Sequence, residues 1–368
     1  MGAMPKDRRG SRREIWNRFA IASACGALLV GCGARTALSD FGSAAGSSAS
    51  EGSSAGSRGT CSDTQNDAVN CGACGAACKG ECTSGRCLVK LVEKQMNVGC
   101  LAVDGSDVFW ASADLPASGR INRISHDGGA FSTISTTNSA PWPCRMALDA
   151  MFVYWTDGSS GAVLKARTRG GIAMTLAMGS GANSIAIDAA SAYFVGQTVG
   201  PMKVPLTGGT PTLLVAAYGG NGGNGVAVDA TSLYWTGRGP RNVSGSVAKV
   251  ALSGGTPTLL ASGQGGPDAI AADDSSVYWT DYAAGTIQKV SHDGGGVKTL
   301  TSEQLNPPVI VVDQASVYWS TSAGTLAKVP KNGGSTTILA LSTALDIAVD
   351  ATSLYWTDGS AILKLTPK

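Results

Sequence analysis

The stretch Ile270-Ala271-Ala272-Asp273-Asp274-Ser275-Ser276-Val277-Tyr278-Trp279-Thr280-Asp281 decides the fold of this chain. It reads as a short apolar strand that ends at an aspartate, a polar turn, and a second strand that carries an aromatic pair. Related stretches recur at intervals of 37 to 45 residues, and a fixed period of this length indicates a repeat architecture. The recurring aspartates are Asp104, Asp149, Asp188, Asp229, Asp273, Asp313 and Asp350.

Two further features recur in every repeat, an aromatic pair shortly after the aspartate and a base inside a later apolar strand. The aromatic pairs are Phe109-Trp110, Tyr154-Trp155, Tyr193-Phe194, Tyr234-Trp235, Tyr278-Trp279, Tyr318-Trp319 and Tyr355-Trp356. The bases are Arg123, Lys165, Lys203, Lys249, Lys289, Lys328 and Lys364. Each repeat therefore predicts four strands, here named a to d, without helical periodicity between them.

Four strands in a unit of about 40 residues have the size of a propeller blade. The fold class predicted from the repeats is therefore all-β, a seven-bladed β-propeller of four-stranded blades over residues 88–368. In six repeats the residue two positions before the aspartate is alanine, and Val311 is the exception. A small side chain there lets neighbouring blades approach each other at the axis.

Three repeats carry a sequence that resembles a known family of propellers. Tyr154-Trp155-Thr156-Asp157, Tyr278-Trp279-Thr280-Asp281 and Tyr355-Trp356-Thr357-Asp358 resemble the Y-W-T-D signature of propellers like those in low-density lipoprotein receptors. That family usually has six blades, whereas seven repeats occur here. The resemblance implies the fold and leaves the function open, because this fold hosts receptors, lyases and lactonases alike.

The N-terminal residues predict export. Residues 1–31 combine a basic stretch with an apolar run from Phe19 to Val30, as in a signal peptide. The run ends in Leu29-Val30-Gly31-Cys32, which resembles the lipobox of bacterial lipoproteins and implies that Cys32 is lipidated. Arg12-Arg13 resembles a twin-arginine export motif, so the export route stays open. We expect a lipid-anchored protein of the cell envelope, at the outer membrane or cell surface rather than the inner membrane.

A tether and a cysteine-rich module are expected between the lipid and the propeller. Residues 32–60 are mostly Gly, Ala and Ser, a composition too poor in apolar surface to fold. Residues 61–87 resemble small modules in exported proteins of predatory soil bacteria. The module contains Cys61, Cys71, Cys74, Cys78, Cys82 and Cys87. In an exported protein three disulfides are favoured over a zinc site, since only one C-x-x-C pair occurs and no His lies nearby.

A fourth disulfide is expected within the propeller. Cys100 and Cys144 each precede an inner strand, at corresponding places in adjacent repeats. Their pairing depends on distance, because a disulfide needs Cα atoms within about 7 Å.

The charge balance gives no electrostatic reason to expect nucleic acid or an anionic membrane surface as partner. The chain has 28 bases and 26 acids, and removing the leader's six bases and two acids leaves 22 and 24. A nearly neutral mature chain has no electrostatic attraction to nucleic acid, and the membrane is expected as partner only through the lipid.

Residues present in all seven repeats are expected to serve the fold before any function. We interpret the repeated aspartates and bases as turn caps or pairs between strands. His126 and His292 occupy the same c-to-d turn in different repeats, and neither belongs to a nucleophile–base pair or an H-x-H metal spacing. The sequence therefore predicts no cofactor, no metal and no catalytic residues.

Function is expected where the repeats differ. Strand direction puts the d-to-a and b-to-c loops on one face, and aromatic and arginine side chains there are typical of binding surfaces. The candidate ligand-binding residues are Trp142, Arg145, Tyr218, Arg238, Arg241 and Tyr282. We predict a binding module for a protein, peptide or glycan. Two alternatives stay open, a hydrolase or lyase built on acids such as Asp114, Asp268 and Glu303, and a structural or adhesion protein of the envelope.

The last expectation concerns how the ring closes. The chain ends just after strand c of the seventh repeat, at Ile362–Leu365, so that repeat lacks a strand d. Residues 88–93 precede the first repeat and belong to no earlier one. We expect them to pair with Ile362–Leu365, because this pairing would cover an open strand edge.

Overall fold

The computed structural model describes residues 63–114, 118–137, 145–178, 181–196, 200–215, 223–239 and 244–368. The leader, Cys32, the tether, Cys61, Trp142, Cys144, Tyr218 and Arg241 lie outside the described residues. Throughout the described ranges the chain forms strands and turns, without helices. No helix in these ranges is long and apolar enough to cross a membrane.

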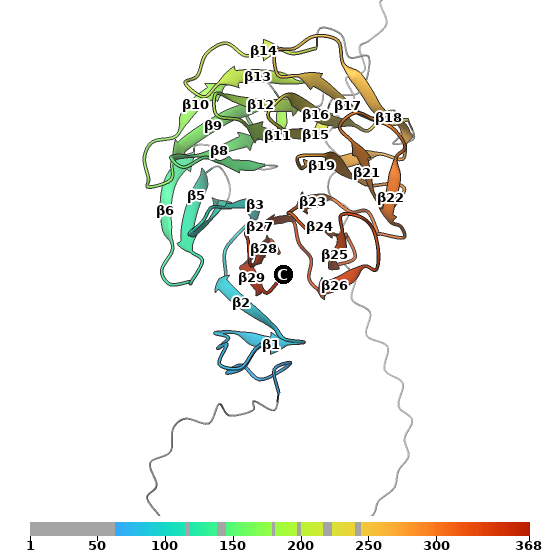
Figure 1. Ribbon diagram of the computed structural model, residues 1–368. Helices are drawn as coiled ribbons and strands as arrows, with labels where there is room; N and C mark the ends of the chain where they lie inside the picture. The colour runs from blue at the N-terminus through green and yellow to red at the C-terminus, as the bar shows by residue number, and fades with distance from the viewer. Residues whose placement is uncertain are drawn as a thin grey trace, which may run out of the picture. The chain divides into compact units, whose positions relative to one another are not determined.

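Seven antiparallel sheets surround one axis, which confirms the seven-bladed propeller (Figure 1). The inner strands β3, β7, β11, β15, β19, β23 and β27 neighbour one another around a closed ring. Blade 1 contains β3 (Val98–Val103), β4 (Asp107–Asp114), β5 (Ser118–Ser125) and β6 (Ser132–Thr137). Blade 2 contains β7 (Met146–Leu148), β8 (Phe152–Asp157), β9 (Ala162–Arg167) and β10 (Met174–Ala177). Blade 3 contains β11 (Ala182–Ile187), β12 (Ser191–Gly196), β13 (Met202–Pro205) and β14 (Thr212–Leu213).

The remaining blades follow the same order from the axis outward. Blade 4 contains β15 (Gly223–Val228), β16 (Ser232–Gly237), β17 (Gly245–Ala251) and β18 (Thr258–Gln264). Blade 5 contains β19 (Pro267–Ala272), β20 (Ser276–Asp281), β21 (Thr286–Ser291) and β22 (Lys298–Thr301). Blade 6 contains β23 (Val309–Val312), β24 (Ser316–Ser320), β25 (Leu326–Pro330) and β26 (Thr337–Ala340). Blade 7 contains β27 (Asp346–Val349), β28 (Leu354–Thr357) and β29 (Ile362–Thr366).

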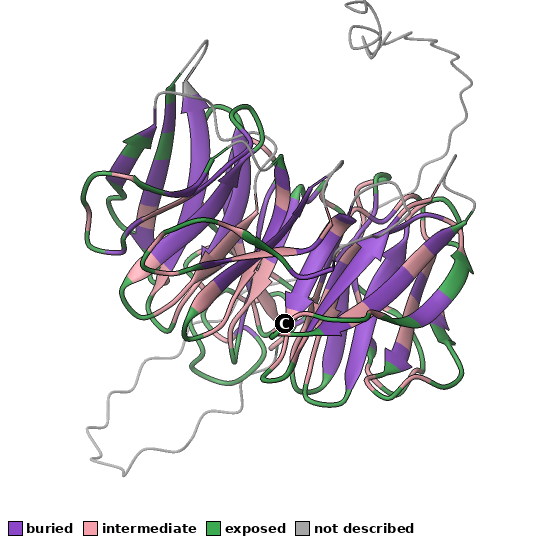
Figure 2. Cartoon of the chain, turned by 90° about the horizontal axis from the view of Figure 1, so that it is seen from above, coloured by how far each residue is buried: buried purple, intermediate pink, exposed green. Residues whose placement is uncertain are grey.

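The core lies between neighbouring blades, where the second strand of each blade buries its aromatic pair. Trp155 of blade 2, for example, packs in one buried cluster with Cys100 and Phe109 of blade 1. Figure 2 shows that the buried residues follow the strands while the exposed residues gather in the turns. Large aromatic side chains dominate the buried area and so the energy of the seams between blades.

Strand β2 (Arg86–Val92) closes the ring as expected. It is the fourth strand of blade 7 and pairs antiparallel with β29, with Leu88 opposite Leu365 and Lys90 opposite Leu363. Val92 is buried in the cluster between blades 7 and 1, whereas Val89 is only half-buried. Both ends of the propeller therefore contribute to one sheet, which leaves no gap in the ring.

The cysteine-rich segment continues the same sheet. Strand β1 (Glu81–Thr83) pairs with the first residues of β2, so the sheet of blade 7 has five strands. Disulfides join Cys71 to Cys82 and Cys78 to Cys87. The second disulfide holds a loop of the segment directly on the strand that closes the ring.

Two further cysteines are oxidised. Cys74 and Cys100 are each disulfide-bonded. Because Cys61 and Cys144 lie outside the described residues, the pairing of Cys100 with Cys144 stays a prediction. The described residues contain no cluster of His, Cys, Asp and Glu that could hold a metal ion.

Candidate functional site

We call the face with the a-to-b and c-to-d turns the lower face, and the face with the b-to-c and d-to-a loops the upper face. On the lower face the repeated aspartates cap turns, as the sequence predicted. In blade 5 one oxygen of Asp273 accepts hydrogen bonds from the backbone N–H groups of Ser275 and Ser276. Its other oxygen accepts a hydrogen bond from the hydroxyl of Tyr278 at 2.9 Å. The same arrangement recurs in blades 2 to 7.

The repeated bases join each blade to the next. Lys249 Nζ of blade 4 donates to the backbone carbonyl of His292 in blade 5 at 2.7 Å. Lys364 of blade 7 donates to the carbonyl of His126 in blade 1 at 3.1 Å, so this contact also closes the ring. The other five bases bond the corresponding turns of their neighbours. These seven bonds are structural, because they repeat with the fold.

Both histidines belong to this lower-face network. His126 Nδ1 lies 3.4 Å from a carboxylate oxygen of Asp350, and its ring stacks on Tyr355 of the preceding blade. His292 makes the same contacts with Asp229 at 3.3 Å and with the ring of Tyr234. Since the two histidines repeat one packing arrangement in separate blades, they form no common site.

A polar cavity of about 160 Å³ opens at the axis. Its polar side chains come from the first residues of the inner strands, at the end of each strand that lies on the upper face. The residues that supply it are Arg145 of blade 2, Ser184 of blade 3, Asn224 of blade 4, Asp268 of blade 5 and Asp346 of blade 7. Five blades thus bring different polar side chains to one place, which we call the upper mouth.

Arg145 and Asp346 face each other across the upper mouth. Arg145 Nη1 lies 3.9 Å from Asp346 Oδ1, and the other carboxylate oxygen accepts a hydrogen bond from the backbone N–H of Leu101 at 3.0 Å. Asp346 is 5% exposed. Burial raises the pKa of Asp346 above its ordinary value, although the charge of Arg145 opposes the shift.

A second ion pair lies beside the first. Arg238, in the b-to-c loop of blade 4, bonds Asp268 at 2.6 Å, and its guanidinium lies 5.1 Å from the ring centre of Tyr282. A glycine permits this approach of two blades, since a Cβ on Gly225 would lie 2.6 Å from the carbonyl oxygen of Asp268. Among the described residues, Arg238 Nε and Asn224 Nδ2 are buried without a hydrogen-bond acceptor. Buried donors without partners are rare and mark places where a ligand or water completes the bonding.

Exposed apolar side chains stand in the loops of the upper face. The d-to-a loops present Met96, Met178, Leu305 and Leu341, which are 58%, 70%, 62% and 83% exposed. These four side chains stand singly in loops between different blades, and none of them lines the upper mouth.

The structure describes only some of the predicted ligand-binding residues. Arg145 lines the upper mouth, while Arg238 and Tyr282 lie next to it through Asp268. Trp142, Tyr218 and Arg241 lie outside the described residues. Of the acids proposed for the enzyme alternative, Asp268 lines the cavity. Glu303 is exposed in a d-to-a loop and does not line it, and the side chain of Asp114 is not described.

Sequence reasoning missed Ser184, Asn224 and Asp346. A signal for them was present, because each stands four or five residues before the repeated aspartate of its blade, as Arg145 and Asp268 do. At these two positions the five blades carry an arginine, a serine, an asparagine and two aspartates, whereas the pattern around them recurs from blade to blade. Variation at the start of the inner strands was therefore a signal for polar residues near the axis, but it did not show which of them meet.

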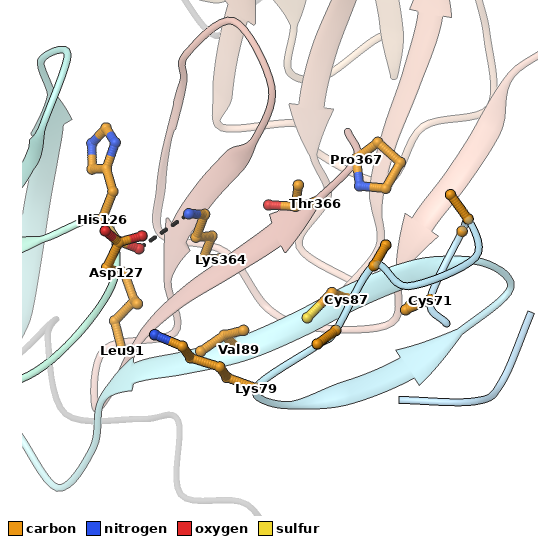
Figure 3. A pocket seen from close by; sticks show the side chains of 14 residues that line it. Cys71, Lys79, Cys87, Val89, Leu91, His126, Asp127, Lys364, Thr366 and Pro367 are labelled. Atoms are coloured by element: carbon orange, nitrogen blue, oxygen red, sulfur yellow. Dashed lines mark hydrogen bonds between the residues drawn. The ribbon is translucent and has the colours of Figure 1, made fainter. Parts of the chain in front are cut away.

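A second, larger cavity lies at the lower side of blade 7. It measures about 450 Å³ and separates the cysteine-rich segment from the turn that holds His126 and Asp127. Figure 3 shows Val89 and Leu91 of β2 along it, with Lys79 beside them and Lys364 bonded to the opposite turn. Its lining is mostly small and apolar. Of its charged groups, Lys79 and Asp127 are exposed in turns, and Lys364 of β29 is already bonded to the carbonyl of His126. This cavity presents fewer polar side chains to a ligand than the upper mouth does.

Comparison with known proteins supports the fold. No protein-family model matches the sequence, and no curated protein matches it. The chain is similar to a streptogramin B lyase structure, with 13% identity and a TM-score of 0.63 over 77% of this chain and 98% of that one. It is also similar to the computationally designed Ika8 protein, with 14% identity and a TM-score of 0.55 over 76% and 98% of the two chains. At such identities the likeness shows a propeller and nothing of its activity.

Proposed function

We propose that this chain is an exported binding protein, anchored to the cell envelope by a lipid on Cys32, whose propeller holds its ligand at the upper mouth. One observation carries the proposal. At the start of the inner strands, where a regular repeat would place similar residues, five blades supply an arginine, a serine, an asparagine and two aspartates to one cavity. A concave site with a few convergent polar groups is the usual form of a ligand site.

An ion pair stacked beside an aromatic ring, next to the mouth, favours binding over a purely structural role. Arg238 and Tyr282 add a charged group stacked near an aromatic ring, a combination enriched where binding energy concentrates.

The test uses the complete mature chain, immobilised and exposed to envelope extract, with bound material identified by mass spectrometry. We expect Arg145→Ala and Arg238→Ala to reduce retention of the ligand by roughly tenfold or more, the effect of losing one charged contact. Lys298→Ala is the matched control, because Lys298 is an exposed base on the outer strand of blade 5. Equal retention by all four proteins would rule out the upper mouth as the binding site.

The anchor is tested separately. Cells fed an alkyne analogue of palmitate should label the wild-type protein and leave Cys32→Ala unlabelled. Labelling of both proteins to the same extent would end the proposal of a lipid on Cys32 and would leave the binding site untouched.

A second candidate, a hydrolase or lyase, is supported by the two acids in the upper mouth. Asp346 is buried with a raised pKa, and such groups concentrate at catalytic sites. Asp268 argues against this role, because its carboxylate is engaged by Arg238 at 2.6 Å. Conversion of a retained ligand by the wild type, abolished in Asp346→Asn, would favour the enzyme.

A further inference from the structure

Among the described residues, the charges in and beside the upper mouth balance. Arg145 in the lining pairs with Asp346 at 3.9 Å, and Arg238 beside the lining pairs with Asp268 at 2.6 Å. A ligand with a net charge would enter a partly buried site in which the described residues offer no spare counter-charge, and burying an unpaired charge is costly. The mouth therefore selects against ions and favours a neutral ligand.

The bonding groups of the mouth are of mixed kind. Asn224 Nδ2 in the cavity lining, and Arg238 Nε beside the cavity through the ion pair with Asp268, are buried donors without acceptors among the described residues. Asp346 is an acceptor, and Ser184 carries a hydroxyl that already accepts from the backbone N–H of Val226 at 3.2 Å. A hydroxyl group donates one hydrogen bond and accepts two, so a ligand with several hydroxyls satisfies donors and acceptors together. An apolar side chain would leave the same groups unpaired.

The volume of the cavity limits the kind of ligand further. The cavity of about 160 Å³ holds roughly five water molecules at about 30 Å³ each. That space suits one sugar ring and is too small for a folded segment of a partner protein.

From these observations we infer that the upper mouth binds a neutral sugar residue, at the end of a glycan or as a free sugar. The inference rests on the proposed function, because it names the ligand of the same site. Asn224 would donate to a hydroxyl oxygen of the sugar inside the cavity, and Arg238, held by Asp268, would donate to one at its edge. Asp346 would accept a hydrogen bond from another hydroxyl of the sugar.

The experiment measures binding of simple probes to the complete mature chain by calorimetry. The neutral probes are the methyl glycosides of glucose, galactose, mannose and N-acetylglucosamine. Glucuronate and glucosamine are the matched charged probes. We expect at least one neutral glycoside to bind, and its charged counterparts to bind roughly tenfold more weakly or not at all.

Variants connect the binding to the site. Asn224→Asp keeps the shape of the side chain but replaces the amide donor by a carboxylate, and Arg238→Lys keeps the charge beside Asp268 but removes Nε. Each should weaken neutral sugar binding by roughly tenfold, whereas Lys298→Ala should not change it. Circular dichroism and a melting curve establish that each variant is folded.

Three results would overturn the inference. These are the absence of binding by any neutral glycoside, stronger binding of glucuronate or glucosamine, and neutral binding that both variants leave unchanged. If envelope extract still supplies a ligand that depends on Arg145 and Arg238, the proposed function stands and only the sugar is wrong. If the protein binds a free methyl glycoside but not a glycan that ends in the same sugar, the site is assigned to free sugars.

Discussion

At the residue scale, one aspartate in each blade organises the lower face. In blade 4, Asp229 caps the a-to-b turn with one oxygen and accepts the hydroxyl of Tyr234 with the other at 2.7 Å. His292 of blade 5 then covers the pair. Blade 1 has Phe109 in place of the tyrosine, so the fold tolerates the loss of the hydroxyl in one blade. The hydroxyl is therefore a stabilising feature and not a requirement.

This arrangement predicts the effect of a single atom. Tyr234→Phe removes a hydrogen bond to a carboxylate and should lower the free energy of unfolding by about 1.5 kcal/mol, since bonds to charged groups contribute about 1.5–3 kcal/mol. Urea titration checks the value. Tyr282→Phe is the control, because Tyr282 lies outside the repeat, and it should change stability little. If Tyr234→Phe leaves the free energy of unfolding unchanged, water in the unfolded chain binds the hydroxyl as well as Asp229 does in the folded one.

At the scale of the elements, strand β2 has two roles. Its first residues belong to the disulfide-linked hairpin with β1, and its later residues complete blade 7 against β29. The boundary expected between Cys87 and Leu88 therefore falls inside a strand. A disulfide at Cys87 restrains the same strand that closes the ring.

Deleting residues 88–93 should lower the melting temperature sharply or cause aggregation. The deletion exposes the edge of β29 and removes Val92 from a cluster that also contains Val98, Trp110 and Tyr355. Burial of a side chain such as Val92 contributes about 1.5–3 kcal/mol, and an open strand edge pairs with other chains.

Lys90→Ala is the control within the same strand. The side chain of Lys90 is exposed and forms an ion pair with Glu93 at the surface, a contact that contributes at most about 1 kcal/mol. Its melting temperature should stay close to that of the wild type. A deletion variant as stable as Lys90→Ala would disprove the role of β2 in closing the ring.

At the scale of the whole molecule, repeated pairs of tyrosine and aspartate set the response to pH. Burial and the bond to aspartate raise the pKa of six tyrosines above their ordinary value, namely Tyr154, Tyr193, Tyr234, Tyr278, Tyr318 and Tyr355. Their stabilisation is complete below the unfolded pKa of about 10 and is lost as the pH rises through the folded pKa.

The aspartates act in the opposite direction. Burial alone would raise their pKa, but hydrogen bonds from tyrosine, lysine and backbone N–H groups outweigh it and lower the pKa, for Asp313 to about 2. The pKa of Asp149, Asp188, Asp229, Asp273 and Asp350 is lowered in the same way. Their stabilisation is present above the unfolded pKa of about 3.9 and is lost as the pH falls through the folded pKa.

We therefore expect a melting temperature that is nearly constant from about pH 5 to pH 9 and falls on both sides. Thermal unfolding followed by circular dichroism between pH 2 and pH 12 measures it. Asp313→Asn should reduce the acid dependence, because the amide does not titrate. A propeller equally stable at both extremes would show that these pairs contribute little to stability.

The sequence by itself determined the number of blades, their strands and the closure of the ring. Each of these depends on local patterns, such as the aspartate before an aromatic pair, or on a missing strand that residues 88–93 supply. The turn-capping role of Asp273 follows for the same reason, since its partners lie within five residues.

Only the tertiary structure decided the upper mouth. Asn224 and Asp346 lie 122 positions apart in the chain and line one cavity because the ring brings the beginnings of inner strands together. Whether Arg238 reaches Asp268, or Arg145 faces Asp346, depends on the distance between blades and on a close approach such as the one at Gly225. No local pattern encodes such distances, because they result from the packing of all seven blades.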